Sequence, residues 1–146
     1  MATMDEPQKM EGAAAERLSA GAAPGQGEGV DRISVHNFCG RLAEQLVHFH
    51  AMRLRDSLFL WIGEGSAPVL GNLAVAMSSP RDSIPVSSLL FGNASDSISD
   101  SLAQRLASKT KKQIFVSYNI QNTDGSLILF VENRIKEEMA TFPEKF

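Results

Sequence analysis

Hydrophobic and polar positions alternate through the first half of the chain in short runs that are typical of β-strands. Pro85 limits the last of these runs to a short edge strand, because proline cannot donate a ladder hydrogen bond. Glycine, serine and proline between the runs predict turns. Four or five strands are therefore expected before any helix, at Val35–Cys39, Leu46–Leu54, Ser57–Ile62, Leu73–Met77 and Ile84–Leu90.

The spacing of apolar residues changes after the fifth run. Leu102 and Leu106 recur at a helical interval and predict a helix from about Asp100 to Lys109. Ser101 and Gln104 have the spacing of a capping box, which would satisfy free amides in the first turn.

The last part of the sequence predicts a hairpin followed by a second helix. Asn122–Gly125 contains an Asp-Gly pair, which tolerates the positive φ of a hairpin turn. The second helix is expected to begin near Asn133, with an apolar stripe at i, i+4 and i+7. The strands on either side of the turn are Ile114–Ile120 and Leu127–Val131, and the stripe is Ile135, Met139 and Phe142.

This order of elements predicts an α+β fold. Strands joined by short turns favour an antiparallel sheet, here of about six strands and sandwich-like, with two helices packed on one face. Residues 31–146 have the length of a single domain. Residues 1–30 are rich in Ala, Gly, Glu and Gln and lack core-forming side chains, so they are expected to be a disordered acidic tail.

Charge and composition exclude several classes of function. Residues 1–30 hold five of the 17 acids and two of the 14 bases, which leaves 12 of each in residues 31–146. A neutral domain argues against binding to nucleic acid or to an anionic membrane. No apolar run approaches the roughly 20 residues of a membrane span. The single cysteine is typical of a reducing compartment, so a cytoplasmic location is expected, with the nucleus as a second one.

Candidate chemistry is sparse. His48 and His50 share one face of a strand and could form half of a zinc site, with Cys39 or His36 on a neighbouring strand. Structural and catalytic zinc sites normally use three or four protein ligands, so histidines in a core or interface are the favoured interpretation. Cys39 lies in an apolar strand without a basic partner, which indicates a small packing residue and not a nucleophile. We expect no cofactor, no metal and no enzymatic activity.

The second and third strands are apolar on both sides. Two short helices can cover about one face of such a sheet, so the other face should be an exposed apolar patch of the kind that binds partners. The prediction for this partner surface is Val47, Phe49, Phe59 and Trp61. Two alternatives stay open. Either the sheet covers both faces by folding on itself as a sandwich, or the partner surface is the one carrying Leu46, His48, His50 and Met52.

Nine segments between residues 33 and 146 resemble the proteasome assembly chaperone 4 family. The resemblance implies a non-catalytic protein that forms a heterodimer with proteasome assembly chaperone 3. It also implies that this pair holds alpha-type subunits of the 20S proteasome, alpha 5 among them, while the alpha ring forms. The segments are Ser34–Phe38, Glu44–Leu54, Asp56–Gly63, Asn72–Met77, Asp82–Ser87, Leu102–Ala107, Val116–Asp124, Val131–Met139 and Phe142–Phe146.

A trafficking scaffold of the longin or roadblock type is the alternative function, because those proteins also dimerise through sheet surface. Their folds place a helix between early strands, whereas this sequence runs its first strands together. The strand order therefore distinguishes the two hypotheses.

Overall fold

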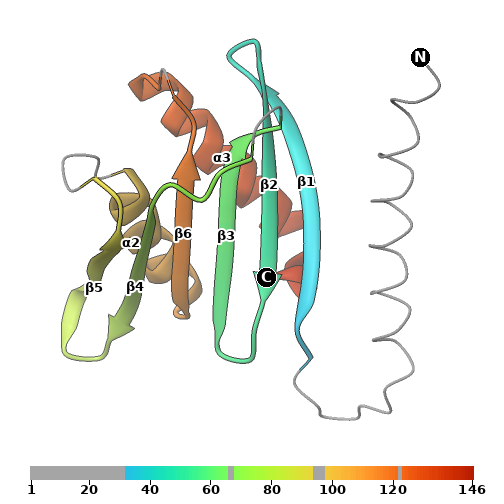
Figure 1. The fold of residues 1–146 in the computed structure, drawn as a ribbon. Coiled ribbons are helices and arrows are strands. Elements are labelled where there is room, and N and C mark those ends of the chain that lie inside the picture. Colours follow the sequence, from blue (N-terminus) through green and yellow to red (C-terminus); the bar gives the residue numbers. More distant parts are fainter. Residues whose placement is uncertain (1–31, 66–67, 94–97, 122) are drawn as a thin grey trace.

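The computed structural model describes residues 32–65, 68–93, 98–121 and 123–146. The predicted tail, residues 1–30, lies outside the described residues. The described residues form six strands and two helices (Figure 1), followed by a short 3-10 helix. The elements are β1 (Ser34–Leu42), β2 (Gln45–Arg53), β3 (Ser57–Glu64), β4 (Leu73–Ser79), β5 (Asp82–Phe91), α2 (Ile98–Thr110), β6 (Gln113–Asn119), α3 (Gly125–Thr141) and η1 (Pro143–Lys145).

The six strands form one sheet in the order β1-β2-β3-β6-β4-β5. β6 lies between β3 and β4, parallel to β3 and antiparallel to β4. A parallel pair needs a crossover connection, and here β4, β5 and α2 together make it. The other neighbouring strands pair antiparallel. β5 is an edge strand, as Pro85 predicts, although it is ten residues long and not short.

The predicted α+β class is confirmed, with six strands and both helices on one side of the sheet (Figure 1). The strands form a single layer, so the sandwich-like arrangement is wrong for this chain. In the part of the chain that the structure describes, no helix is long and apolar enough to cross a membrane.

The predicted hairpin around Asp124 is wrong, because Leu127–Val131 belongs to α3. The side chain of Asp124 caps this helix, with Oδ1 accepting a hydrogen bond of 2.8 Å from the Leu127 amide. A short apolar run does not by itself distinguish a strand from a buried helix. The decisive signal is the four-residue interval that joins this run to the later stripe: Leu127, Val131, Ile135 and Met139 are all buried.

The helix α2 also differs from its prediction in detail. It begins at Ile98, so Ser101 lies inside the helix and not at its cap. Gln104 Nε2 instead donates a hydrogen bond of 2.9 Å to the carbonyl oxygen of Pro85. This bond fixes the helix against the edge strand β5.

The core lies between the helices and one face of the sheet. Alternate residues of each central strand point into it, because side chains on a strand alternate between the two faces. The sheet contributes Val47, Phe49, Ala51, Leu58, Leu60, Ile62, Ile114 and Val116, and the helices contribute Leu102, Leu106, Val131 and Ile135.

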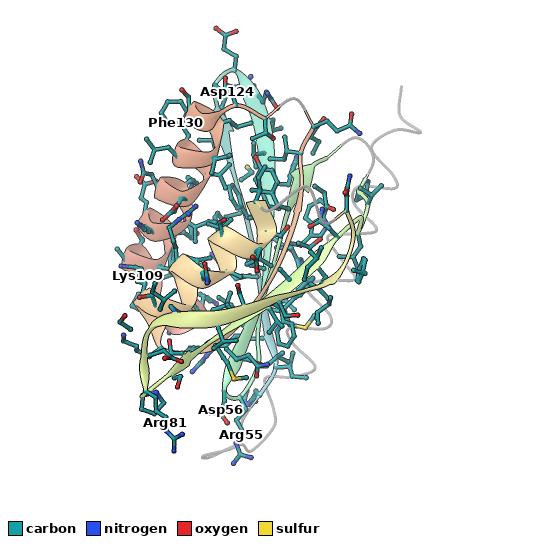
Figure 2. All side chains as sticks on the ribbon, turned by 90° about the vertical axis from the view of Figure 1, so that its left-hand side faces the viewer. Arg55, Asp56, Arg81, Lys109, Asp124 and Phe130 are labelled. Atoms are coloured by element: carbon teal, nitrogen blue, oxygen red, sulfur yellow. The ribbon has the colours of Figure 1, made fainter. Side chains whose placement is uncertain are left out.

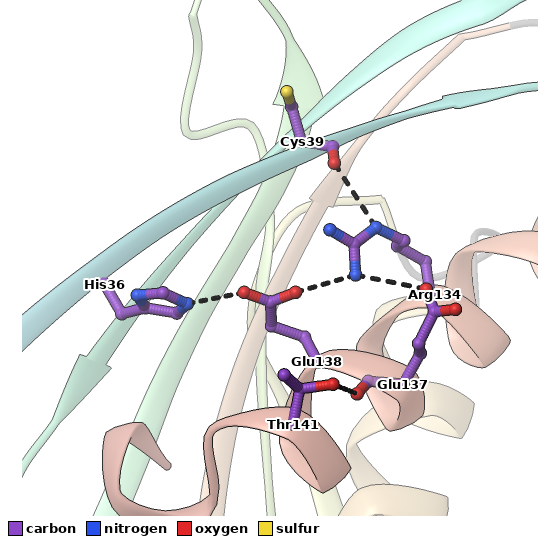
Figure 3. Close-up of polar contacts among 6 residues, drawn as sticks. All are labelled: His36, Cys39, Arg134, Glu137, Glu138 and Thr141. Atoms are coloured by element: carbon purple, nitrogen blue, oxygen red, sulfur yellow. Dashed lines mark hydrogen bonds and ion pairs between the residues drawn. The ribbon is translucent and has the colours of Figure 1, made fainter.

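A buried carboxylate connects α3 to the edge strand β1 (Figure 3). Glu138 is 6% exposed and accepts hydrogen bonds from His36 Nε2 at 2.7 Å and from Arg134 Nη1 at 2.8 Å. Arg134 also donates from Nε to the carbonyl oxygen of Cys39, at 3.3 Å. Burial opposes ionisation of Glu138, but the two hydrogen-bond donors outweigh it, so the pKa of Glu138 is lowered.

Candidate functional site: the open face of the sheet

Neither helix covers the second face of the sheet, which we call the open face. The strand register aligns one row of side chains across all six strands on this face. Five of the six are apolar, and most are half-buried by their neighbours. The row consists of Val35, Met52, Phe59, Phe115, Val75 and Ser88.

Exposed apolar side chains extend this row towards the edge strand β5. Met77 and Val86 pair across β4 and β5, and their exposed fractions are 48% and 58%. Phe59 and Phe115 occupy neighbouring positions on β3 and β6 at the centre of the sheet. Aromatic side chains at the centre of an apolar face are typical anchors of protein interfaces.

The next row along the strands is more polar. Asn37, His50, Trp61 and Ser117 are aligned across β1, β2, β3 and β6. Burial lowers the pKa of His50, whose Nδ1 lies 2.5 Å from Oδ1 of Asn37. Because an amide oxygen can only accept a hydrogen bond, Nδ1 of His50 is the donor in this contact.

Trp61 is held in a fixed orientation on this face. Its indole Nε1 donates a hydrogen bond of 2.7 Å to the carbonyl oxygen of Val69. The ring lies across Gly63, where a Cβ atom would come within 2.5 Å of the indole carbons. A hollow of about 1270 Å³ opens beside the ring, lined by residues that include Cys39, His48 and Leu70. The indole thus forms one wall of a preformed recess.

The structure separates the four residues that were predicted to form one partner surface. Val47 and Phe49 are 0% and 1% exposed and pack against the helices, so their assignment to the exposed surface is wrong. Phe59 and Trp61 lie on the open face. The pairing of Phe49 with Ile62 is the physical reason, because paired residues share a face and Ile62 lies in the core.

Sequence reasoning missed Phe115, on β6 far along the chain, and Val75 and Met77 on β4, the strand that follows β3 in the sequence. The small residues Ala74 and Ala76 alternate with Val75 and Met77, and this alternation was a usable signal. It separates a tightly packed face of β4 from a face with large side chains.

The histidines and the cysteine do not converge as the zinc hypothesis requires. His36 points towards α3, whereas Cys39 and His48 pair on the open face. Within the described ranges, no three side chains of His, Cys, Asp or Glu are grouped as a metal ion would need.

Comparisons with known proteins identify the family. The profile described as proteasome assembly chaperone 4 matches residues 46–120. A human and a mouse protein, both described as proteasome assembly chaperone 4, are 68% and 67% identical to this chain over 114 residues. The alignments cover 78% of this chain and 91% of each relative. The chain belongs to the proteasome assembly chaperone 4 family.

The fold agrees with this assignment. A chain from the crystal structure of a chaperone complex for yeast 20S proteasome assembly has a TM-score of 0.57 against this chain, at 14% identity. The similarity covers 73% of this chain and 96% of the yeast-complex chain, and at this identity it concerns the fold alone. Proteasome assembly chaperones are a non-catalytic family, so this member assists proteasome assembly and is not an enzyme. The trafficking-scaffold alternative is therefore excluded.

Proposed function

We propose that the open face is the surface through which this proteasome assembly chaperone pairs with proteasome assembly chaperone 3. The pair then holds alpha-type subunits of the 20S proteasome, alpha 5 among them, while the alpha ring forms. A cytoplasmic site of action, with the nucleus as a second compartment, is part of the same proposal. Membership of the family supports a role in assembly.

The row of apolar side chains across the whole open face is the observation that carries the proposal. Phe59 and Phe115 lie at its centre, and Met77 and Val86 are about half exposed towards its edge. A soluble protein rarely leaves a continuous apolar surface of this kind uncovered, because contact of apolar groups with water is unfavourable. A partner with a complementary apolar surface would remove this face from water.

The polar row beside the aromatic centre gives the surface directional contacts. Asn37 and His50 form a hydrogen-bonded pair, and Trp61 is already oriented by its bond to Val69. Side chains that are ordered before binding lose less conformational entropy when the partner arrives. These residues therefore favour one docking geometry over others.

The test measures pairing and folding on the same variants. Phe59→Ser and Trp61→Ser should each weaken binding to purified proteasome assembly chaperone 3 by about thirtyfold, since a central aromatic often contributes about 2 kcal/mol. Met77→Asp places a charge at a position that is already 48% exposed, so it should reduce binding with little effect on folding. Calorimetry of mixing gives the affinities, and circular dichroism checks each isolated variant.

Leu129→Asp is the matched control. Leu129 is 56% exposed on α3, on the helix side of the sheet, so its replacement should leave pairing unchanged. Unchanged binding by folded Phe59→Ser, Trp61→Ser and Met77→Asp would refute the assignment of the open face. Equal loss in the Leu129→Asp control would place the contact elsewhere.

A further inference from the structure

Charged side chains are sorted between the two ends of the sheet. Eight bases lie in the turns and adjoining segments at one end, which we call the basic end: Arg32, Arg53, Arg55, Arg81, Lys109, Lys111, Lys112 and Lys145. Of the described acids, five lie at this end: Asp56, Asp82 and Glu144 beside the bases, and Glu137 and Glu138 near the end of α3. Eight bases against five acids leave a surplus of three positive charges. Figure 2 shows Arg55 and Arg81 at this end and Asp124 at the other.

The sheet register brings these bases together from distant parts of the sequence. The start of β1 lies beside the end of β2, because Ser34 pairs with Arg53. The turn between β2 and β3 lies beside the start of β6, because Ser57 pairs with Gln113. Arg53 Nη1 also donates a hydrogen bond of 3.1 Å to the carbonyl oxygen of Glu144, which fixes η1 at the same end.

The opposite end has the reverse charge. Of the described residues, the acids Glu44, Glu64, Asp100 and Asp124 lie there, together with one base, Arg41. The dipole of α2 favours this arrangement, because Asp100 lies in its first turn and Lys109 in its last. The 12 acids and 12 bases of residues 31–146 thus cancel in sum but not in space.

Two bases at the basic end, Arg81 and Lys109, are not neutralised by a carboxylate of the described residues. Glu132, Glu137 and Glu138 of α3 pair with Arg105, Lys136, Arg134 and His36, and with neither Arg81 nor Lys109. Arg81 and Lys109 are exposed and form no ion pair with any residue that the structure describes. Burial lowers the pKa of the half-buried Lys112, and the nearby charge of Arg53 lowers it further. The basic end therefore has a positive potential.

We infer that the basic end is a second docking surface, which binds an acidic surface of the protein that the chaperone holds during assembly. The inference rests on the proposed function, in which the open face binds the partner chaperone. Side chains in the turns lie at the ends of the strands, so a partner on the open face leaves them accessible. The acidic opposite end would repel the same ligand and fix its orientation.

A protein ligand fits this charge distribution better than a nucleic acid does. Five carboxylates lie at the same end as the eight bases, and the opposite end of the domain is acidic. Continuous phosphate backbone would meet these acids, whereas a protein surface can present carboxylates only where bases face them.

The test begins with a probe that does not depend on the partner chaperone. The full chain should bind a fluorescent 20-residue polyglutamate peptide at 50 mM salt and lose most of this binding at 300 mM salt. The triple variant Arg81→Glu, Lys109→Glu, Lys111→Glu should bind the peptide at least tenfold more weakly. The triple variant Arg81→Lys, Lys109→Arg, Lys111→Arg keeps the charge and should bind it like the unaltered chain.

The second arm uses the purified pair of chaperones and a purified alpha-type subunit. Charge reversal should weaken capture of the subunit by about tenfold or more, with the affinity between the two chaperones unchanged. Arg41→Glu, at the acidic end, is the control for position and should have no effect. If the unaltered chaperones do not pair, the proposed function fails. If they pair and the charge-reversed pair captures the subunit normally, this inference fails.

Two further results would overturn the inference by naming another occupant. In the first, charge reversal no longer weakens capture of the subunit once residues 1–30 are deleted. That result would mean that the basic end binds residues 1–30 of the same chain. The other is that a 20-nucleotide single strand binds as tightly as polyglutamate and competes with the subunit, which would make the surface a general polyanion site.

Discussion

Replacing Phe49 tests, in one measurement of stability, which face of the sheet forms the core. Phe49 is 1% exposed, and its ring stacks on Phe38 with centroids 4.6 Å apart and an interplanar angle of 1°. Phe49→Ala therefore removes a completely buried ring and leaves a cavity between the sheet and the helices. A change of this kind costs about 3–5 kcal/mol of folding free energy.

The loss is large compared with the stability of the domain. Domains of this size unfold with free energies of about 5–15 kcal/mol. The midpoint of thermal unfolding should fall by about 12–20 °C, since each kcal/mol shifts it by roughly 4 °C at this length. The stacked pair should also be coupled: the double variant with Phe38→Ala should cost about 0.5–1.5 kcal/mol less than the sum of the single changes.

Urea unfolding of the isolated chain, followed by circular dichroism at several protein concentrations, measures these quantities. Trp61→Ala, on the open face, is the comparison and should cost clearly less than Phe49→Ala. A loss below about 1 kcal/mol for Phe49→Ala would refute the assignment of the two sheet faces. So would a Trp61→Ala variant that is the less stable of the two.

Three other predictions concern single features of the fold. Glu138→Gln should cost about 2 kcal/mol at pH 7, because it weakens charged hydrogen bonds to a buried group. Because the pKa of Glu138 is lowered in the folded state, its ionised form stabilises the protein above the ordinary value of 4.5, and this stabilisation is lost as the pH falls through the folded-state pKa. At pH 3 the free energies of unfolding of the variant and the wild type, measured in urea, should therefore differ less than at pH 7. Asp124→Ala should cost about 1 kcal/mol in the same assay, since it removes the cap of α3, and Asp124→Asn should restore most of it. Deleting residues 1–30 should leave the thermal midpoint within error, because their composition adds no core, and a fall of several degrees would contradict this.

Local patterns determined most elements correctly. Alternation predicted β1 to β5 in order, and helical spacing predicted α2 to within two residues at each end. These patterns depend on neighbours in the chain, and the sequence contains that information directly. The error at Leu127–Val131 arose where an Asp-Gly pair suits both a hairpin turn and the start of a helix.

The pairing of strands was decided only by the tertiary structure. β6 lies between β3 and β4 because α2 carries the chain back across the sheet, and no local signal specifies that position. The same register determines which apolar residues share a face. Alternation put Val47 with Phe49, and Phe59 with Trp61, but it could not tell whether the two pairs lie on the same side.

The sequence by itself determined that this protein has apolar strands on both sides, a neutral domain and no constellation of catalytic groups. It also showed the family resemblance, because long segments of specific residues can be compared without a structure. The structure decided which face stays open and how the charges are arranged. Net charge is a sum over residues, whereas the charge of a surface patch depends on which turns lie side by side. The strand order places the turns that carry Arg55, Arg81 and Lys111 at the same end of the sheet.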